Sequence, residues 1–341
     1  MCNAGHPVLV TKVPVRTADL GGWTDTWFAT RGLVCNVAVE PGIEVRIRDG
    51  RIPDGCIALC VSGKRVVGRP SDPTVWPDPL MAACLRSAPR GCEIEICAGV
   101  PTGSGLGTSA AITVALLGAF DRWHGHEFDE RTLMDLAERA HALETGLGRQ
   151  SGVQDHFAAA LGGVRLWDIT YPQARVVNTV TNQAVLTALD NRLVTVYLGA
   201  PHESSLIHER VIHELEGLDE RSTEGLLQPL REAARRGFDA LVEGDFDVYG
   251  QAMVANHEAQ RRLSTELISE LADLVVTVAA LQGAAGWKVN GAGGEGGSLA
   301  VLLGEGQSAA GIEAALDEFE NVKVLPLGLA RVGLRCEWFA D

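Results

Sequence analysis

Glycine, serine and threonine are concentrated in Pro101-Thr-Gly-Ser-Gly-Leu-Gly-Thr-Ser109, which runs into an apolar stretch from Ala110 to Phe120. The alternating glycines Gly103, Gly105 and Gly107 let the backbone approach a ligand closely with its N–H groups exposed. The apolar stretch has helical length, and the start of a helix adds unpaired donors and the positive end of the dipole. Both features suit a polyphosphate, and an ordinary strand-to-helix turn is the alternative. No lysine precedes the Thr-Ser pair, so the segment is not a Walker loop.

A second glycine cluster, Lys288-Val-Asn-Gly-Ala-Gly-Gly-Glu-Gly-Gly297, lies near the C-terminus. It contains Gly-x-Gly-x-x-Gly, but a dinucleotide-binding fingerprint must open a helix. The residues that follow, Ser298 to Leu303, have the apolar character of a strand. This excludes a Rossmann motif and leaves two interpretations: a functional loop, or a hairpin that only joins two strands.

Two acids, Glu144 and Asp155, stand eleven positions apart. The apolar stripe of a predicted helix from Arg131 to Glu144 places Glu144 at the edge of the buried face. An unpaired buried carboxylate is costly, and a metal or other cation would relieve that cost. On one unbroken helix the two acids would stand ~16 Å apart, but glycines at 146, 148 and 152 can reverse the chain and bring them together. A capping or salt-bridged acid is the alternative for each.

The chain that must position these residues has 341 residues, which corresponds to about two domains. The formal net charge of −15 argues against nucleic acid and anionic lipid as partners, so a bound phosphate would be held locally. The eight cysteines are scattered and are interpreted as buried apolar residues rather than zinc ligands. The apolar runs are shorter than a membrane span and the first residues do not resemble a secretory signal, so we expect a cytoplasmic protein.

Hydrophobic periodicity predicts an α+β fold in two lobes. Short β-branched runs open the chain, helices follow the first glycine segment, and a largely helical second half ends in further strands. The boundary is expected between residues 180 and 192, which gives an N-terminal lobe of residues 1–185 and a C-terminal lobe of residues 186–341.

Taken together, four ordered motifs resemble those of the GHMP kinase superfamily. Val13-Pro-Val-Arg16 with Leu20-Gly-Gly-Trp-Thr-Asp25 is similar to the opening motif of that family, and Pro101 to Ala111 to its Pro-x-x-x-Gly-Leu-Gly-Ser-Ser-Ala signature. The segment from Glu144 to Gly163 resembles the acid-bearing motif, and Lys288 to Gly297 the third glycine motif. The resemblance implies a ribosomal-protein-S5-domain-2-like N-terminal lobe that binds ATP and a ferredoxin-like C-terminal lobe.

The resemblance also implies roles for individual residues. ATP phosphates would lie on Gly103, Ser104, Gly105, Leu106, Gly107, Thr108 and Ser109, and Mg²⁺ would be held by Ser109 and Glu144. Asp155 would accept or orient the proton of the attacking hydroxyl, and Arg16 would stabilise the charge around it. The sugar would contact Asp25, Gly22, Trp23, Gly291, Ala292 and Gly293.

Within the superfamily, the segment Gly-Gly-Trp-Thr-Asp-Thr resembles the corresponding segment of fucokinases and heptose 7-phosphate kinases. The implied activity is phosphorylation of the anomeric hydroxyl of a sugar or sugar phosphate, such as D-glycero-D-manno-heptose 7-phosphate. A free sugar of the fucose, arabinose, galactose or uronate type is the alternative acceptor. Heptose kinases usually carry a basic residue at a position near His202. Its replacement in this chain leaves open whether the acceptor already carries a phosphate. A catalytically silent sugar-binding regulator of the same fold is a further alternative.

Overall fold

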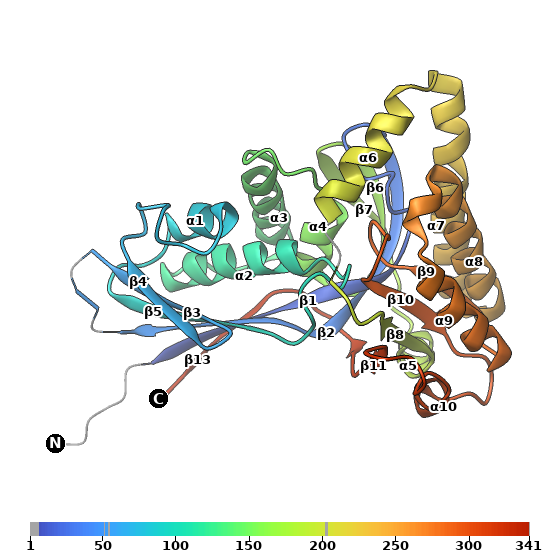
Figure 1. The fold of residues 1–341 in the computed structure, drawn as a ribbon. Helices are drawn as coiled ribbons and strands as arrows, with labels where there is room; N and C mark the ends of the chain where they lie inside the picture. The colour runs from blue at the N-terminus through green and yellow to red at the C-terminus, as the bar shows by residue number, and fades with distance from the viewer. Residues whose placement is uncertain (1–6, 51, 54, 202–203, 341) are drawn as a thin grey trace.

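The computed structural model describes residues 7–50, 52–53, 55–201 and 204–340. These residues form helices and two β-sheets joined by loops, which confirms the predicted α+β class. The larger sheet and its covering helices lie on the left of Figure 1, and the smaller sheet lies at the lower right. The site described below forms where the two parts meet.

The larger sheet is built around the long strand β2 (Arg31–Asp49), whose two halves have different neighbours. Its second half pairs with β5 (Cys92–Ala98), and its first half pairs with β6 (Val164–Thr170). The other strands of this sheet are β1 (Val8–Leu20), β3 (Ile57–Val61), β4 (Lys64–Gly68), β7 (Gln173–Thr179), β12 (Gly328–Leu329) and β13 (Arg335–Phe339). The order is β13-β1-β2-β5-β3-β4, with β6 and β12 paired to β2 and β7 paired to β6.

Helices cover one face of this sheet (Figure 1). They are α1 (Pro79–Leu85), α2 (Thr108–Trp123), α3 (Glu130–Thr145) and α4 (Gln154–Leu161). The apolar residues of α2 are buried against the sheet, as the side chains of Val114, Leu116 and Phe120 illustrate. The helix starts directly after the first glycine segment, so that segment is fixed at the N-terminal end of a buried helix.

The smaller sheet is antiparallel, in the order β11-β8-β10-β9. Its strands are β8 (Leu193–Tyr197), β9 (Gly286–Val289), β10 (Ser298–Leu302) and β11 (Lys323–Leu325). Helices α9 (Glu270–Leu281) and α10 (Ala309–Ala315) pack on it through a cluster that includes Val275, Ile312 and Val301. The second glycine cluster connects β9 to β10, so the prediction that it joins two strands is correct.

Four further helices complete the second half: α5 (Gln183–Arg192), α6 (Ser204–Glu216), α7 (Glu220–Glu243) and α8 (Phe246–Leu263), followed by the short 3₁₀ turn η1 (Thr265–Leu267). Gly244, with φ of 77°, ends α7, and the side chain of Asp245 caps the start of α8. Helix α7 packs on β1 and β2, whereas α8 packs on β9. This helix pair therefore connects the two sheets.

The predicted division into residues 1–185 and 186–341 falls inside α5, just before the smaller sheet begins at β8. The last strands, β12 and β13, return to the larger sheet and pair with β2 and β1. The last described strand therefore lies beside the first. The position of a domain boundary stays a prediction.

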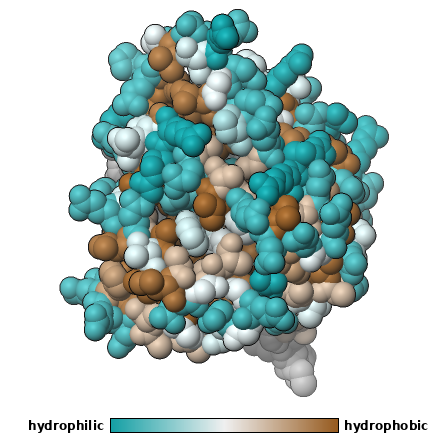
Figure 2. All heavy atoms as spheres, turned by 90° about the vertical axis from the view of Figure 1, so that its right-hand side faces the viewer, coloured by the Kyte–Doolittle hydropathy of each residue, from teal (hydrophilic) through white to brown (hydrophobic). Residues whose placement is uncertain are grey.

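Among the described residues, no helix is both long enough and apolar enough to cross a bilayer. Figure 2 shows the right-hand side of the molecule, where hydrophilic residues surround scattered apolar ones. The described cysteines carry free thiols. Cys35, Cys84 and Cys92 are buried, whereas Cys97 is exposed, so the interpretation of the cysteines as buried residues is wrong for Cys97. Burial raises the pKa of each of the three buried thiols to about 12, so they are protonated at neutral pH.

Candidate active site

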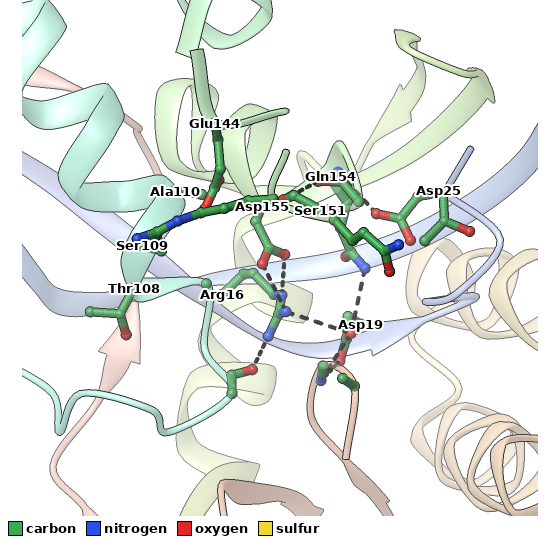
Figure 3. Close-up of a pocket in the computed structure, with 18 of the residues that line it drawn as sticks. Arg16, Asp19, Asp25, Thr108, Ser109, Ala110, Glu144, Ser151, Gln154 and Asp155 are labelled. Atoms are coloured by element: carbon green, nitrogen blue, oxygen red, sulfur yellow. Dashed lines mark hydrogen bonds and ion pairs between the residues drawn. The ribbon is translucent and has the colours of Figure 1, made fainter. Parts of the chain in front are cut away.

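A cavity of about 500 Å³ opens between the first glycine segment, the connection from α3 to α4, the end of β1 and the second glycine cluster (Figure 3). Most residues singled out in the sequence line it together: Arg16, Trp23, Asp25, Gly103, Gly105, Gly107, Thr108, Ser109, Glu144, Asp155, Gly291 and Ala292. They come from separate parts of the chain. The fold thus brings the four motifs to one place.

The other four predicted residues lie behind the cavity wall rather than on it. The carbonyl of Ser104 accepts a hydrogen bond of 2.6 Å from the Ser298 hydroxyl, and the carbonyl of Leu106 accepts one of 3.0 Å from the Arg16 N–H. A Cβ added to Gly293 would lie 2.2 Å from the Leu267 carbonyl oxygen, so Gly293 serves close packing. Gly22 sits tightly against the carboxylate of Asp19, where an added Cβ would lie 2.8 Å from Oδ2.

The first glycine segment forms a cradle of backbone donors. Gly103, Gly105 and Gly107 have φ angles of 71°, 73° and 75°, in the left-handed region that favours glycine. The N–H groups of Gly105, Leu106 and Gly107 find no acceptor among the described residues. Successive free N–H groups at a helix N-terminus bind anions such as phosphate. The cradle therefore fits the phosphates of a nucleotide.

A hydroxyl and a carboxylate meet at the start of α2. Oγ of Ser109 donates a hydrogen bond of 2.9 Å to Oε1 of Glu144, and Nε2 of His156 lies 2.9 Å from Oε2. Glu144 thus has two polar neighbours, which favours the alternative of a paired acid over that of an unpaired one. Burial raises the pKa of Glu144, but His156 and Ser109 outweigh burial and hold that pKa below its usual value. Glu144 is ionised at neutral pH.

This pair fits a divalent cation. In the part of the chain that the structure describes, no cluster of three or more His, Cys, Asp or Glu side chains could hold a metal by itself. One carboxylate and one hydroxyl suit Mg²⁺, which commonly takes few protein ligands and keeps its other contacts with phosphate and water. Ser109 follows the last glycine of the cradle, Gly107, by two positions, so protein and phosphate ligands would face the same ion.

Asp155 and Arg16 form a two-point ion pair at the centre of the cavity (Figure 3). Nε of Arg16 lies 2.7 Å from Oδ1 and Nη2 lies 3.1 Å from Oδ2. Arg16 also donates to the carbonyl of Gly105, which ties the guanidinium to the cradle. The Asp155 side chain is 23% exposed toward the cavity while that of Arg16 is 5% exposed, so the carboxylate is the group that a ligand can reach.

Asp25 lies at the other end of the cavity, buried against the start of α4 (Figure 3). Its Oδ2 accepts a hydrogen bond of 3.2 Å from the backbone N–H of Gln154. A Cβ on Gly152 would lie 2.1 Å from the same oxygen, so this position requires glycine. Burial, and next the charge of Asp155, raise the pKa of Asp25 to about 7. The group can thus change its protonation near neutral pH.

Sequence reasoning missed several polar residues of the cavity, among them Asp19, Gln154, Asp78 and Arg149. Gln154 stands inside the acid-bearing motif directly before Asp155, and Asp19 lies between the two parts of the opening motif, so their position in the chain was the available signal. Asp78 caps α1, and Nη2 of Arg149 lies 3.4 Å from it. Neither residue stands in a recognisable pattern. His202, beside which heptose kinases carry a basic residue, lies outside the described residues.

Comparison with known proteins finds a matching family model and several named kinases. The family model "GHMP kinases N terminal domain" matches residues 79–163. The chain is 24% identical to D-glycero-alpha-D-manno-heptose 7-phosphate kinase of Campylobacter jejuni, over 83% of this chain and 86% of that protein. It is 31% identical to mevalonate kinase of Thermococcus gammatolerans, over 64% of this chain and 62% of that protein.

A plant relative is longer than this chain. The bifunctional fucokinase/GDP-fucose pyrophosphorylase of Arabidopsis thaliana is 25% identical over 92% of this chain, which spans 31% of the plant protein's length. Among solved structures, a D-glycero-D-manno-heptose 1-phosphate kinase from Bacteroides thetaiotaomicron superposes with a TM-score of 0.72 at 18% identity, covering 98% of this chain and 100% of that one. The predicted resemblance and fold are both confirmed.

Proposed function

We propose, from the premise that residues 79–163 are a GHMP kinase N-terminal domain, that this chain transfers the γ-phosphoryl group of ATP to the anomeric (C1) hydroxyl of a sugar or sugar phosphate. The observation that carries the proposal is the position of Asp155. Its carboxylate is held by Arg16 beside free backbone donors, within one cavity. Phosphoryl transfer needs a base, a positive charge and donors that hold phosphate. Here these would be the Asp155 carboxylate, the Arg16 guanidinium and the cradle.

The cradle from Gly103 to Ser109 is the proposed seat of the ATP phosphates. The Ser109 hydroxyl and Glu144 would hold Mg²⁺, which would neutralise charge on the phosphates. Arg16 keeps its guanidinium against both Asp155 and the cradle, so it can stabilise charge that develops between them. Catalysis of this kind is mostly alignment and electrostatic stabilisation.

Asp155 is the proposed acceptor of the proton from the attacking hydroxyl. Its exposed oxygens face the cavity, and the ion pair fixes their direction before an acceptor arrives. Asp25, at the other end of the cavity, would accept hydrogen bonds from further sugar hydroxyls. Gly291 and Ala292 would form the wall beside the acceptor, where the absence of a long side chain leaves room for a ring.

Relatives support a sugar as the acceptor. The Campylobacter heptose kinase aligns over most of both chains, whereas the mevalonate kinase aligns over less than two thirds of either. D-glycero-D-manno-heptose 7-phosphate is the first sugar phosphate to test, and fucose, arabinose, galactose and uronates are the free sugars. Mevalonate is included to test the other class of relative.

The test measures ADP release from Mg·ATP with each compound in turn. Release that depends on one sugar supports the proposal. Release with mevalonate alone would indicate that the acceptor is a non-sugar alcohol and not a sugar. Sugar binding by calorimetry without any ADP release would identify the chain as the silent regulator.

A further inference from the structure

A buried ion pair joins the two sheets directly behind the cavity. Nζ of Lys288, on β9, lies 2.7 Å from Oδ1 of Asp19, near the end of β1, and both side chains are 1% exposed. Lys288 also donates a hydrogen bond of 2.6 Å to the carbonyl of Val289. The lysine does not line the cavity. It is therefore not placed to contact a phosphate, and its function must be exerted through Asp19.

Asp19 is the point at which groups from both parts of the molecule converge (Figure 3). The N–H of Gly291, in the second glycine cluster, donates to both carboxylate oxygens at 3.2 Å. The side-chain amide of Gln154 donates to Oδ2 at 3.4 Å, and Nη2 of Arg16 lies 3.9 Å from the same oxygen. The carboxylate thus contacts the glycine loop on one side and the residue before Asp155 on the other.

An irregularity in β1 directs Asp19 to this point. The pairing of β1 with β2 shifts register between Thr17 and Leu20, and Ala18 has a φ of 50°, unusual for a residue other than glycine. Such bulges re-aim side chains near functional sites. The Ala18 N–H donates a hydrogen bond of 2.9 Å to Oδ1 of Asn290, which holds the bulge against the smaller sheet.

The charges in this row alternate. Arg16 lies between Asp155, at 2.7 Å, and Asp19, at 3.9 Å, and Lys288 lies on the far side of Asp19. Burial raises the pKa of Asp19, but Lys288 and Arg16 outweigh burial and keep that pKa below its usual value. Lys288 is the nearer counter-charge of Asp19, at 2.7 Å against 3.9 Å for Arg16, so Arg16 makes its shorter contact with Asp155 while it still faces Asp19.

We propose that Asp19 is a positioning residue for phosphoryl transfer: it fixes the inner side of the Arg16 guanidinium and anchors the backbone of Gly291, with Lys288 as its counter-charge. The proposal rests on the proposed function. It assigns Lys288, the first residue of the second glycine cluster, an electrostatic role behind the site. It also makes the rate depend on Lys288, a residue that does not line the cavity.

The test compares Asp19→Asn, Lys288→Met and the double variant D19N/K288M. Each single change leaves a buried charge without its partner, which is strongly destabilising, whereas removal of both charges is far less so. We expect the denaturation midpoint of each single variant to fall and that of the double variant to recover most of the loss. Lys12→Met is the matched control, because Lys12, on β1, also forms an ion pair, with Glu44 on β2, but its side chain is 56% exposed.

Turnover should not recover with stability. At a temperature where all variants are folded, we expect kcat of the double variant to stay about 10- to 100-fold below that of the wild type, since Arg16 has lost its inner contact. The dissociation constant of an ATP analogue should change less than about 3-fold, because the cradle is intact. A double variant with wild-type kcat would overturn the proposal, because Asp19 would then be only structural.

A spectroscopic readout separates this proposal from the proposed function. The ¹⁵N–¹H signal of the Arg16 Nε–H group, identified by its loss in Arg16→Lys, reports the ion pair with Asp155 without any substrate. We expect it to move and broaden in D19N and in the double variant, but not in K12M. An unchanged signal in D19N overturns the positioning role even if the chain is a kinase. If the signal changes and no sugar is phosphorylated, the positioning of Arg16 stands and the proposed function fails.

Discussion

The carboxylate of Asp155 faces the guanidinium of Arg16 with both oxygens, at 2.7 and 3.1 Å, although the two residues are 139 positions apart in the chain. Asp155 stands in the first turn of α4 and Arg16 in β1, so the contact fixes a helix against a strand. The guanidinium is nearly buried and the carboxylate is partly open to the cavity. An acid whose direction is set before a ligand binds is suited to act on that ligand.

Replacing Asp155 with asparagine should lower kcat at least ~10²-fold, because an amide neither accepts the proton nor supplies the negative charge that faces Arg16. ATP affinity should change little. Steady-state kinetics and calorimetry measure the two quantities. Asp168→Asn is the control, because Asp168 pairs with Arg175 at 2.8 Å on the surface. Near-normal turnover in D155N would remove Asp155 from the mechanism.

Replacing Glu144 with glutamine should raise the Mg²⁺ concentration needed for half-maximal rate, since a neutral amide is a weaker ligand for a hard cation. The Ser109 hydrogen bond can persist, because the amide oxygen still accepts it. A Mg²⁺ titration of the rate checks this, with Glu127→Gln at an 81% exposed side chain as the control. An unchanged titration curve would identify Glu144 as a structural acid that pairs with His156.

Alanine at Gly291 should reduce turnover, because its Cβ would lie 2.9 Å from the Gly105 carbonyl oxygen and 3.2 Å from Nη2 of Arg16. Gly306→Ala is a matched control: Gly306 has a comparable φ of 76°, but nothing lies within 4 Å of an added Cβ. Both variants carry the backbone strain of a positive φ, of order 1 kcal/mol. Equal losses of kcat in the two would show that strain alone, and not the crowding of Arg16, is responsible.

The raised pKa of Asp25 predicts a pH-dependent stability. Burial and the charge of Asp155 raise this pKa from 3.8 to about 7, so between these values the folded chain binds a proton that the unfolded chain has released. The free energy of unfolding therefore falls as pH rises from about 4 to about 7, by about 1.4 kcal/mol per unit of pKa difference. Denaturation of the wild type and of Asp25→Asn across this range measures the effect. The asparagine variant should lack this slope, and parallel curves would refute the assignment.

Much of the fold followed from the sequence because its elements carry strong local signals. The long Ala/Leu/Val stretch after the glycine segment forms α2, and the glycines between Glu144 and Asp155 do separate α3 from α4. Helix α4 starts only at Gln154, directly before Asp155. Residues 150–153, which precede it, line the cavity near Asp25 or support its wall.

What the sequence could not provide were contacts between distant segments. In the sequence, Lys288 is simply the first residue of a glycine motif. Only the position of β9, paired with β10 in the smaller sheet, brings it to Asp19. His156 reads as an ordinary helix residue until the reversal between α3 and α4 sets its ring beside Glu144. Both partners are fixed by tertiary packing, for which residue spacing along the chain carries no signal.

In the proposed reaction, phosphate is transferred to the anomeric hydroxyl. An anomeric hydroxyl is more acidic than other sugar hydroxyls, so a carboxylate such as Asp155 is better matched to it as a base. NMR of the product formed from the sugar that supports ADP release tests this directly. We predict a phosphorus signal coupled to the anomeric proton, and a phosphorus coupled to a proton on any other carbon would contradict the account.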